Sequence, residues 1–201
     1  DVDVALLEEG LARLFPGGGE GDLKQRDAAR MAVERGFAVI SGGPGTGKTT
    51  TVKRILALLL EQAHALAERS GGRPRTRFKL MAPTGKAAAR MEEAIAEDLD
   101  KLPLNPPQLR ARMPTEASTI HRALGTLPDT PTRFRHDARR PLPADVVVVD
   151  EASMVGLALM TKLVEAVPPD ARLVLLGDRD QLASVEAGAV LGDICYAGLE
   201  A

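Results

Sequence analysis

The residues in this chain best suited to chemistry form a glycine-rich run from Gly42 to Thr49. The run fits the pattern G-x-x-x-x-G-K-[ST] and lies between an apolar stretch and a helical one. In such a loop backbone N–H groups turn toward phosphate oxygens, and the following helix presents its positive end. We expect Lys48 to reach the β- and γ-phosphates of ATP and Thr49 to bind Mg²⁺. The expected nucleotide-binding residues are Gly43, Pro44, Gly45, Thr46, Gly47, Lys48, Thr49 and Thr50.

A phosphate-binding loop needs a second element, because Mg²⁺ must also be held by a carboxylate at the end of a neighbouring strand. Asp150 follows four consecutive valines, so it lies where a buried strand turns polar. Open α/β sheets place their ligands at this carboxyl end. The sequence predicts that Asp150 binds the metal and that Glu151 polarises the water that attacks the γ-phosphate. Alternatively, both acids only cap the helix that follows.

Strands and helices alternate around these groups. Apolar runs predict strands at residues 37–41, 78–82, 145–150 and 172–176, and helical spacing predicts helices at 22–35, 48–68, 86–98, from 157 and from about 187. Strands that are apolar throughout indicate a parallel sheet covered on both faces. The predicted fold is therefore an α/β P-loop NTPase. Residues 102–143 are proline-rich and predicted to be mostly irregular, with a short helix at 119–124.

The length of 201 residues and the 44% hydrophobic content fit one globular domain. Residues 1–21 predict a helix to Leu14 and a glycine-rich linker, and residues 22–201 predict the ATPase domain. No apolar run approaches the ~20 residues that cross a bilayer. The single cysteine suits a reducing compartment, so we expect a soluble, cytoplasmic protein without a membrane partner. The first residue is Asp1, which suggests a piece of a longer protein.

The net charge of −2 is unevenly distributed. Residues 69–90 include seven basic residues and no acidic one: Arg69, Arg73, Arg75, Arg77, Lys79, Lys86 and Arg90. Charge alone favours a solvated loop and strand edge. The position of the run beside the turn at 83–86 favours a surface that binds nucleic-acid phosphates.

Three further runs decide among P-loop families. They are Ala82-Pro-Thr-Gly-Lys86, Asp150-Glu-Ala-Ser-Met154 and Leu176-Gly-Asp-Arg-Asp-Gln-Leu182. In this order they resemble motifs Ia, II and III of superfamily-one helicases. Together with residues 42–50, 82–90, 118–122 and 176–193, they make the chain similar to the RecD family, the α subunits of exonuclease V (RecBCD). The resemblance covers about residues 22–196.

This resemblance implies the first RecA-like motor lobe of a 5′-to-3′ DNA helicase. The family acts on double-strand ends in repair and recombination, with RecB-like and RecC-like partner subunits and a single-stranded DNA track. By resemblance, Gln25 reads the adenine base and Gln181 senses the γ-phosphate, so the catalytic set is Lys48, Glu151 and Gln181.

The same resemblance gives a set of DNA-binding residues. They are Thr84, Gly85, Lys86, Thr119 and His121. In motif Ia a strand-to-helix turn offers N–H groups and a hydroxyl to DNA phosphates. Aromatic residues are scarce, at four Phe, one Tyr and no Trp, so a base-stacking platform must lie mostly elsewhere.

No motif of a second lobe, no arginine finger and no nuclease site is found in the 201 residues. We therefore expect this chain to bind ATP but to hydrolyse it very slowly. Two other functions stay open. One is a P-loop ATPase switch that loads or remodels protein partners, which DNA-stimulated turnover would distinguish from a helicase. The other is an assembly module that binds ATP only to hold its shape, and the intact set Lys48, Thr49, Asp150 and Glu151 argues against it.

Overall fold

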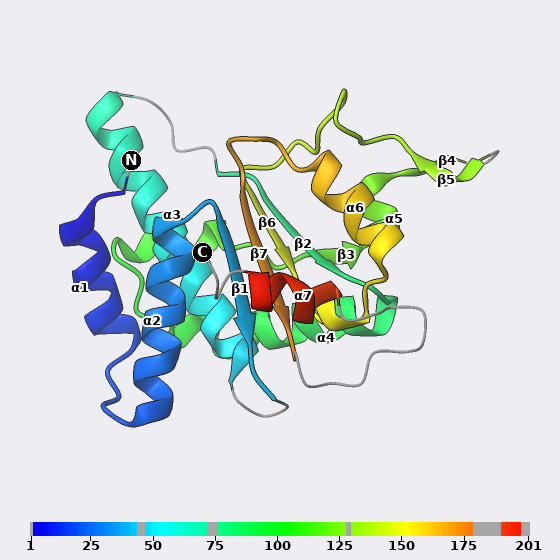
Figure 1. The fold of residues 1–201 in the computed structure, drawn as a ribbon. Coiled ribbons are helices and arrows are strands. Elements are labelled where there is room, and N and C mark those ends of the chain that lie inside the picture. Colours follow the sequence, from blue (N-terminus) through cyan, green and yellow to red (C-terminus); the bar gives the residue numbers. More distant parts are fainter. Residues whose placement is uncertain (1, 44–46, 72–75, 128–129, 179–189, 198–201) are drawn as a thin grey trace.

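The computed structural model describes residues 2–43, 47–71, 76–127, 130–178 and 190–197 (Figure 1). The helices are α1 Val4–Leu14, α2 Glu20–Glu34, α3 Lys48–Ser70, α4 Gly85–Ala96, α5 Ile120–Leu124, α6 Leu157–Ala166 and α7 Val190–Ala197, with short 3₁₀ turns η1 Leu99–Lys101, η2 Pro107–Arg112 and η3 Ala152–Met154. The strands are β1 Phe37–Ser41, β2 Phe78–Ala82, β3 Ala117–Thr119, β4 Thr126–Leu127, β5 Thr130–Phe134, β6 Val146–Val149 and β7 Arg172–Gly177.

Five parallel strands form the central sheet in the order β1-β7-β6-β2-β3. The register pairs Ser41 with Gly177 and Ala82 with Thr119. Val149 of β6 pairs with Met81 on one side and with Leu175 on the other. The carboxyl ends of all five strands therefore lie along one edge of the sheet. The predicted α/β class with a parallel sheet is confirmed.

Helices cover both faces of the sheet, and α1, α2 and α3 lie on the opposite side from α5 and α6 (Figure 1). Side chains of a strand alternate between faces, so the four buried valines of β6 serve two cores. Val146 and Val148 join the core under α1 to α4, and Val147 and Val149 join the core under α5, α6 and α7. This double burial explains why the run has no polar alternation.

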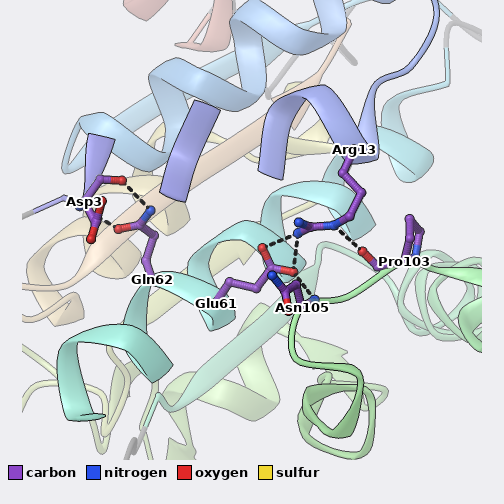
Figure 2. Close-up of polar contacts among 6 residues, drawn as sticks. All are labelled: Asp3, Arg13, Glu61, Gln62, Pro103 and Asn105. Carbon is purple, nitrogen blue, oxygen red and sulfur yellow. Dashed lines mark hydrogen bonds and ion pairs between the residues drawn. The ribbon is translucent and has the colours of Figure 1, made fainter. Parts of the chain in front are cut away.

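Helix α1 is held against α3 by apolar and polar contacts (Figure 2). The Asp3 N–H donates to Gln62 Oε1 at 2.8 Å, and Gln62 Nε2 donates to Asp3 O at 2.9 Å. Arg13 Nη2 donates to both carboxylate oxygens of Glu61 at 2.6 Å, and Arg13 Nε donates to Pro103 O at 2.6 Å. Helix α1 thus shares the core of the lobe, and a domain boundary at residue 21 stays a prediction.

Between residues 102 and 143 the structure differs from the sequence prediction. Instead of mostly irregular chain, it contains the 3₁₀ turn η2, the edge strand β3 and the antiparallel pair β4 and β5. Strand β3 is only three residues long, partly polar and paired on one side, so it lacks the apolar run that marks the other strands. The expected helix near 119–124 is present as α5. No helix in the described part of the chain is long and apolar enough to cross a membrane.

Candidate nucleotide site

The phosphate-binding loop leaves the end of β1 and enters α3, as the sequence predicts. Gly42 N–H donates to Gly177 O at 3.1 Å, which ties the start of the loop to the end of β7. Gly47 has a left-handed backbone (φ 75°), and a Cβ there would lie 2.9 Å from Gln25 Nε2. The left-handed backbone favours glycine, and a Cβ here would also displace the Gln25 amide. Pro44, Gly45 and Thr46 lie outside the described residues.

The proximity to Gly47 places the Gln25 amide of α2 directly beside the loop. The two residues are far apart in sequence, and the packing of α2 against α3 brings them together. A side-chain amide at this position can pair with the donor and acceptor on the edge of an adenine base. The adenine-reading role of Gln25 stays a prediction.

The Lys48 side chain bends back over the loop. Its ammonium donates to Gly42 O and, at 2.8 Å, to Gly43 O. Two backbone carbonyls therefore accept the hydrogen bonds of the Lys48 ammonium, which the motif predicts will contact phosphate oxygens. Thr49 and Thr50 follow in the first turn of α3.

Asp150 comes directly after β6, and its N–H donates to Met81 O at 2.9 Å. Its carboxylate accepts the Glu151 N–H at 2.8 Å. Burial raises the pKa of Asp150, while the Glu151 N–H and the positive charge of Lys48 oppose the rise. A mostly buried carboxylate held near a lysine is suited to a cation, because a bound cation would stabilise its charged form.

Glu151 has a left-handed backbone (φ 50°), a conformation that costs a non-glycine residue about 1–2 kcal/mol. This turn leads the chain into η3, which packs against the end of β7. A Cβ on Gly177 would lie 2.4 Å from Leu191 Cδ2 and 3.1 Å from Ser153 N. Gly177 thus lets η3 and α7 approach the strand end, a role that sequence reasoning missed although the run Leu176-Gly-Asp178 contains the residue.

One cavity of about 830 Å³ joins these groups. Its near half is lined by Lys48, Thr49, Thr50, Asp150 and Glu151, so the structure brings the predicted phosphate and metal residues together. Its far half runs between α3 and α4 as far as Pro103. Sequence reasoning missed Lys53 and Arg54 of this far half, and it named Arg90 only as part of the basic run, not as a cavity residue. In the sequence, only the helical spacing after Lys48 points to Lys53 and Arg54.

The proposed DNA contacts lie along the same edge, at the ends of the next two strands. Thr84 caps α4 by accepting the Ala87 N–H at 3.1 Å, and Thr84, Gly85 and Lys86 are exposed. Thr119 ends β3 beside β2 and caps α5 by accepting the Arg122 N–H at 3.2 Å. His121 is exposed, and its ring meets Phe134 edge-on at 5.8 Å between centroids.

The expectation that the basic run binds nucleic-acid phosphates beside this turn is wrong for Arg69 and Arg77. Arg77 precedes β2, whereas Lys86 follows its far end. Arg77 Nη2 pairs with Asp145 at 2.8 Å at the opposite edge of the sheet, and Arg69 pairs with Asp3 at 2.6 Å. These two arginines therefore support the fold. Arg73 and Arg75, like Gln181, lie outside the described residues.

A family profile described as "AAA domain" matches residues 25–187 of this chain. The chain belongs to this AAA domain family. The matched segment contains the loop, Asp150, Glu151 and all the proposed DNA contacts, and family membership implies ATP binding.

Curated relatives carry the comparison further. The chain is 56% identical to "RecBCD enzyme subunit RecD" of Mycolicibacterium smegmatis over 92% of its own length and 31% of the relative. It is 42% identical to "ATP-dependent RecD2 DNA helicase" of Deinococcus radiodurans over 77% of its length and 17% of the relative. The similarity to RecD that the motifs indicate is confirmed. The chain spans less than a third of these relatives.

Solved structures support the architecture alone. The large terminase of bacteriophage HK97 superposes with a TM-score of 0.55 at 15% identity, over 96% of this chain and 41% of the terminase chain. At this low identity the likeness shows the fold and carries nothing about the reaction.

Proposed function

We propose that this chain is the ATP-hydrolysing first motor lobe of a 5′-to-3′ DNA helicase. In the whole protein it would work in an exonuclease V complex with RecB-like and RecC-like subunits, in the cytoplasm, on double-strand DNA ends. The printed names of its relatives, a RecBCD subunit and an ATP-dependent DNA helicase, support this. The observation that carries it is the single sheet edge on which the nucleotide cavity and the motif Ia turn are neighbours.

On the nucleotide side, Lys48 would exchange two loop carbonyls for phosphate oxygens. The Thr49 hydroxyl and the Asp150 carboxylate would hold Mg²⁺, and the buried Asp150 beside Lys48 fits a cation. Bound Mg²⁺ neutralises charge that develops on the phosphates. Glu151 lines the same cavity and would orient the attacking water and accept its proton. Gln25 would read the base, and Gln181 would respond to the γ-phosphate.

On the DNA side, the start of α4 offers an anion site. The N-terminus of a helix has N–H groups without intrahelical partners and a positive dipole end. Gly85 and Lys86 form this first turn, and Lys86 adds a charge. Thr119 at the end of β3 and His121 in α5 would continue the contact. Phosphate contacts of this kind fix the strand without reading its sequence.

DNA-stimulated ATP hydrolysis by the full-length protein tests this function. Phosphate release should rise when single-stranded DNA is added, and Glu151→Gln should abolish the rise while the protein still binds ATP. Exposed Lys24, which pairs with Glu20, offers a control: Lys24→Ala should behave as wild type. Wild-type turnover that DNA leaves unchanged would contradict a translocating motor and favour a switch that acts on protein partners.

A further inference from the structure

The far half of the nucleotide cavity contains four cationic side chains, and three have partners. Lys53 is buried and donates to Glu97 O, the carbonyl that ends α4. Lys101 pairs with Asp98 at 2.5 Å. These two charges hold the end of α4 and η1 in place, so they contribute to the wall of the cavity.

The other two cations are arginines with contrasting surroundings. The Arg54 guanidinium lies 4.8 Å from the centre of the Phe15 ring. Arg90 is exposed, and within the described residues it makes no hydrogen bond, ion pair or ring contact. No described residue pairs with the Arg90 guanidinium, so this group is available to a ligand.

Helix geometry puts Arg90 at the rim of the cavity. Ala87, Met91 and Ala94 line the cavity and define the face that α4 turns toward it. At 100° per residue, Arg90 stands about 65° from the centre of that face, on the side of Lys86. Lys86 is one turn earlier, a distance at which side chains on a helix are neighbours. Around the axis of α4, Arg90 therefore stands between the face that lines the cavity and Lys86, the proposed DNA contact.

ATP and a DNA strand are both polyanions, and each bound near this rim would be attracted to a cation there. A guanidinium is suited to this because it stays charged and presents five donors in a planar fork. It can donate to a DNA phosphate and still face the nucleotide. The first ligand to bind would order this exposed side chain at an entropic cost that offsets most of its attraction. The second ligand would then gain the same attraction without that cost, so the state with both ligands bound is favoured.

We propose that Arg90 is a positioning residue that couples DNA binding to nucleotide binding. The proposal rests on the function proposed above. Without Arg90 each ligand should bind alone nearly as before, because Lys48 and Lys86 remain. Only the mutual enhancement should be lost.

The test measures how much DNA tightens the binding of a non-hydrolysable ATP analogue to the full-length protein. Calorimetry gives the dissociation constant of the analogue without oligo-dT and with saturating oligo-dT, and the ratio of the first to the second is the coupling. Arg90→Gln should lower this ratio about tenfold, within the usual range of coupling between sites. The affinity for each ligand alone should stay within about threefold of wild type. Arg90→Lys, which keeps the charge, should retain most of the ratio.

Glu93→Gln is the matched control, since Glu93 is exposed on the same helix and does not line the cavity. Its ratio should equal that of wild type. An unchanged ratio in Arg90→Gln would overturn the role of Arg90, and so would an equal loss in Glu93→Gln. A wild-type protein that binds the analogue but no DNA would overturn the proposed function itself.

Discussion

Two carboxylates, the buried Glu61 and the partly buried Asp150, lie in the same domain and have different surroundings. The Glu61 side chain is 1% exposed and takes both Arg13 contacts and the Asn105 N–H at 2.7 Å (Figure 2). Asp150 accepts the Glu151 N–H, and Lys48 contributes charge from a distance. Burial raises the pKa of both groups, against the opposition of these partners.

From this difference we propose a structural role for Glu61 and a metal-binding role for Asp150. Glu61 receives a full set of donors from α1 and the 102–105 segment, so its charge is compensated by the fold. Asp150 has fewer donors among the described residues and lines the cavity with Lys48. Buried charges without matching partners cluster at functional sites because a ligand completes them. The predictions below test this contrast.

The largest effect is expected at Glu61. Arg13→Ala leaves a buried carboxylate without its cation, and breaking a buried pair on one side costs about 3 kcal/mol of unfolding free energy. Chemical denaturation measures it. Lys24→Ala removes one partner of a pair whose side chains are 76% and 84% exposed, and should cost less than about 1 kcal/mol. Equal effects of the two variants would contradict the structural role of the Arg13 and Glu61 pair.

Asp150→Asn should show the opposite pattern. The variant removes a partly buried charge that has few donors, so the unfolding free energy should stay equal or rise. Mg²⁺-dependent ATP affinity should fall at least about tenfold, because losing even a residue that only supports a metal ligand typically lowers metal affinity by that factor. The raised pKa of Asp150 in the folded state also sets the direction of the pH dependence. The folded protein favours the protonated acid, so metal-free wild type should lose stability as the pH rises through that pKa, and Asp150→Asn should not. A clear loss of stability in Asp150→Asn would make Asp150 a structural acid like Glu61.

The smallest effect concerns specificity. Gln25→Ala should narrow the preference for ATP over GTP about three- to tenfold, the equivalent of a net hydrogen bond or two. Competition binding with both nucleotides measures the preference. Fold stability should change little, because Gln25 lies at the cavity end of the lobe beside Gly47. If the preference persists in the variant, Gln25 does not read the base.

Much of this arrangement could be read from the sequence, because the loop, Asp150 and Thr84 each end an apolar run that marks a strand. The strands at 37–41 and 78–82 were predicted with the bounds that they have. Contacts between distant segments could not be predicted. Arg77 and Lys86 belong to one basic run in the sequence, yet the whole of β2 lies between them in the structure. The sequence of α1 likewise does not indicate that Arg13 pairs with Glu61.

Titration of Mg²⁺-ATP into the 201-residue chain tests the central claim most directly. Wild type should bind one nucleotide in a Mg²⁺-dependent manner. Lys48→Ala removes the charge that the motif predicts will reach the phosphates, and should bind at least about tenfold more weakly. Phosphate release by the same sample should be very slow and unaffected by DNA, because a cation from a second lobe is worth 10³ to 10⁵ in rate in comparable enzymes. Equal affinities of wild type and Lys48→Ala would contradict the assignment of the loop.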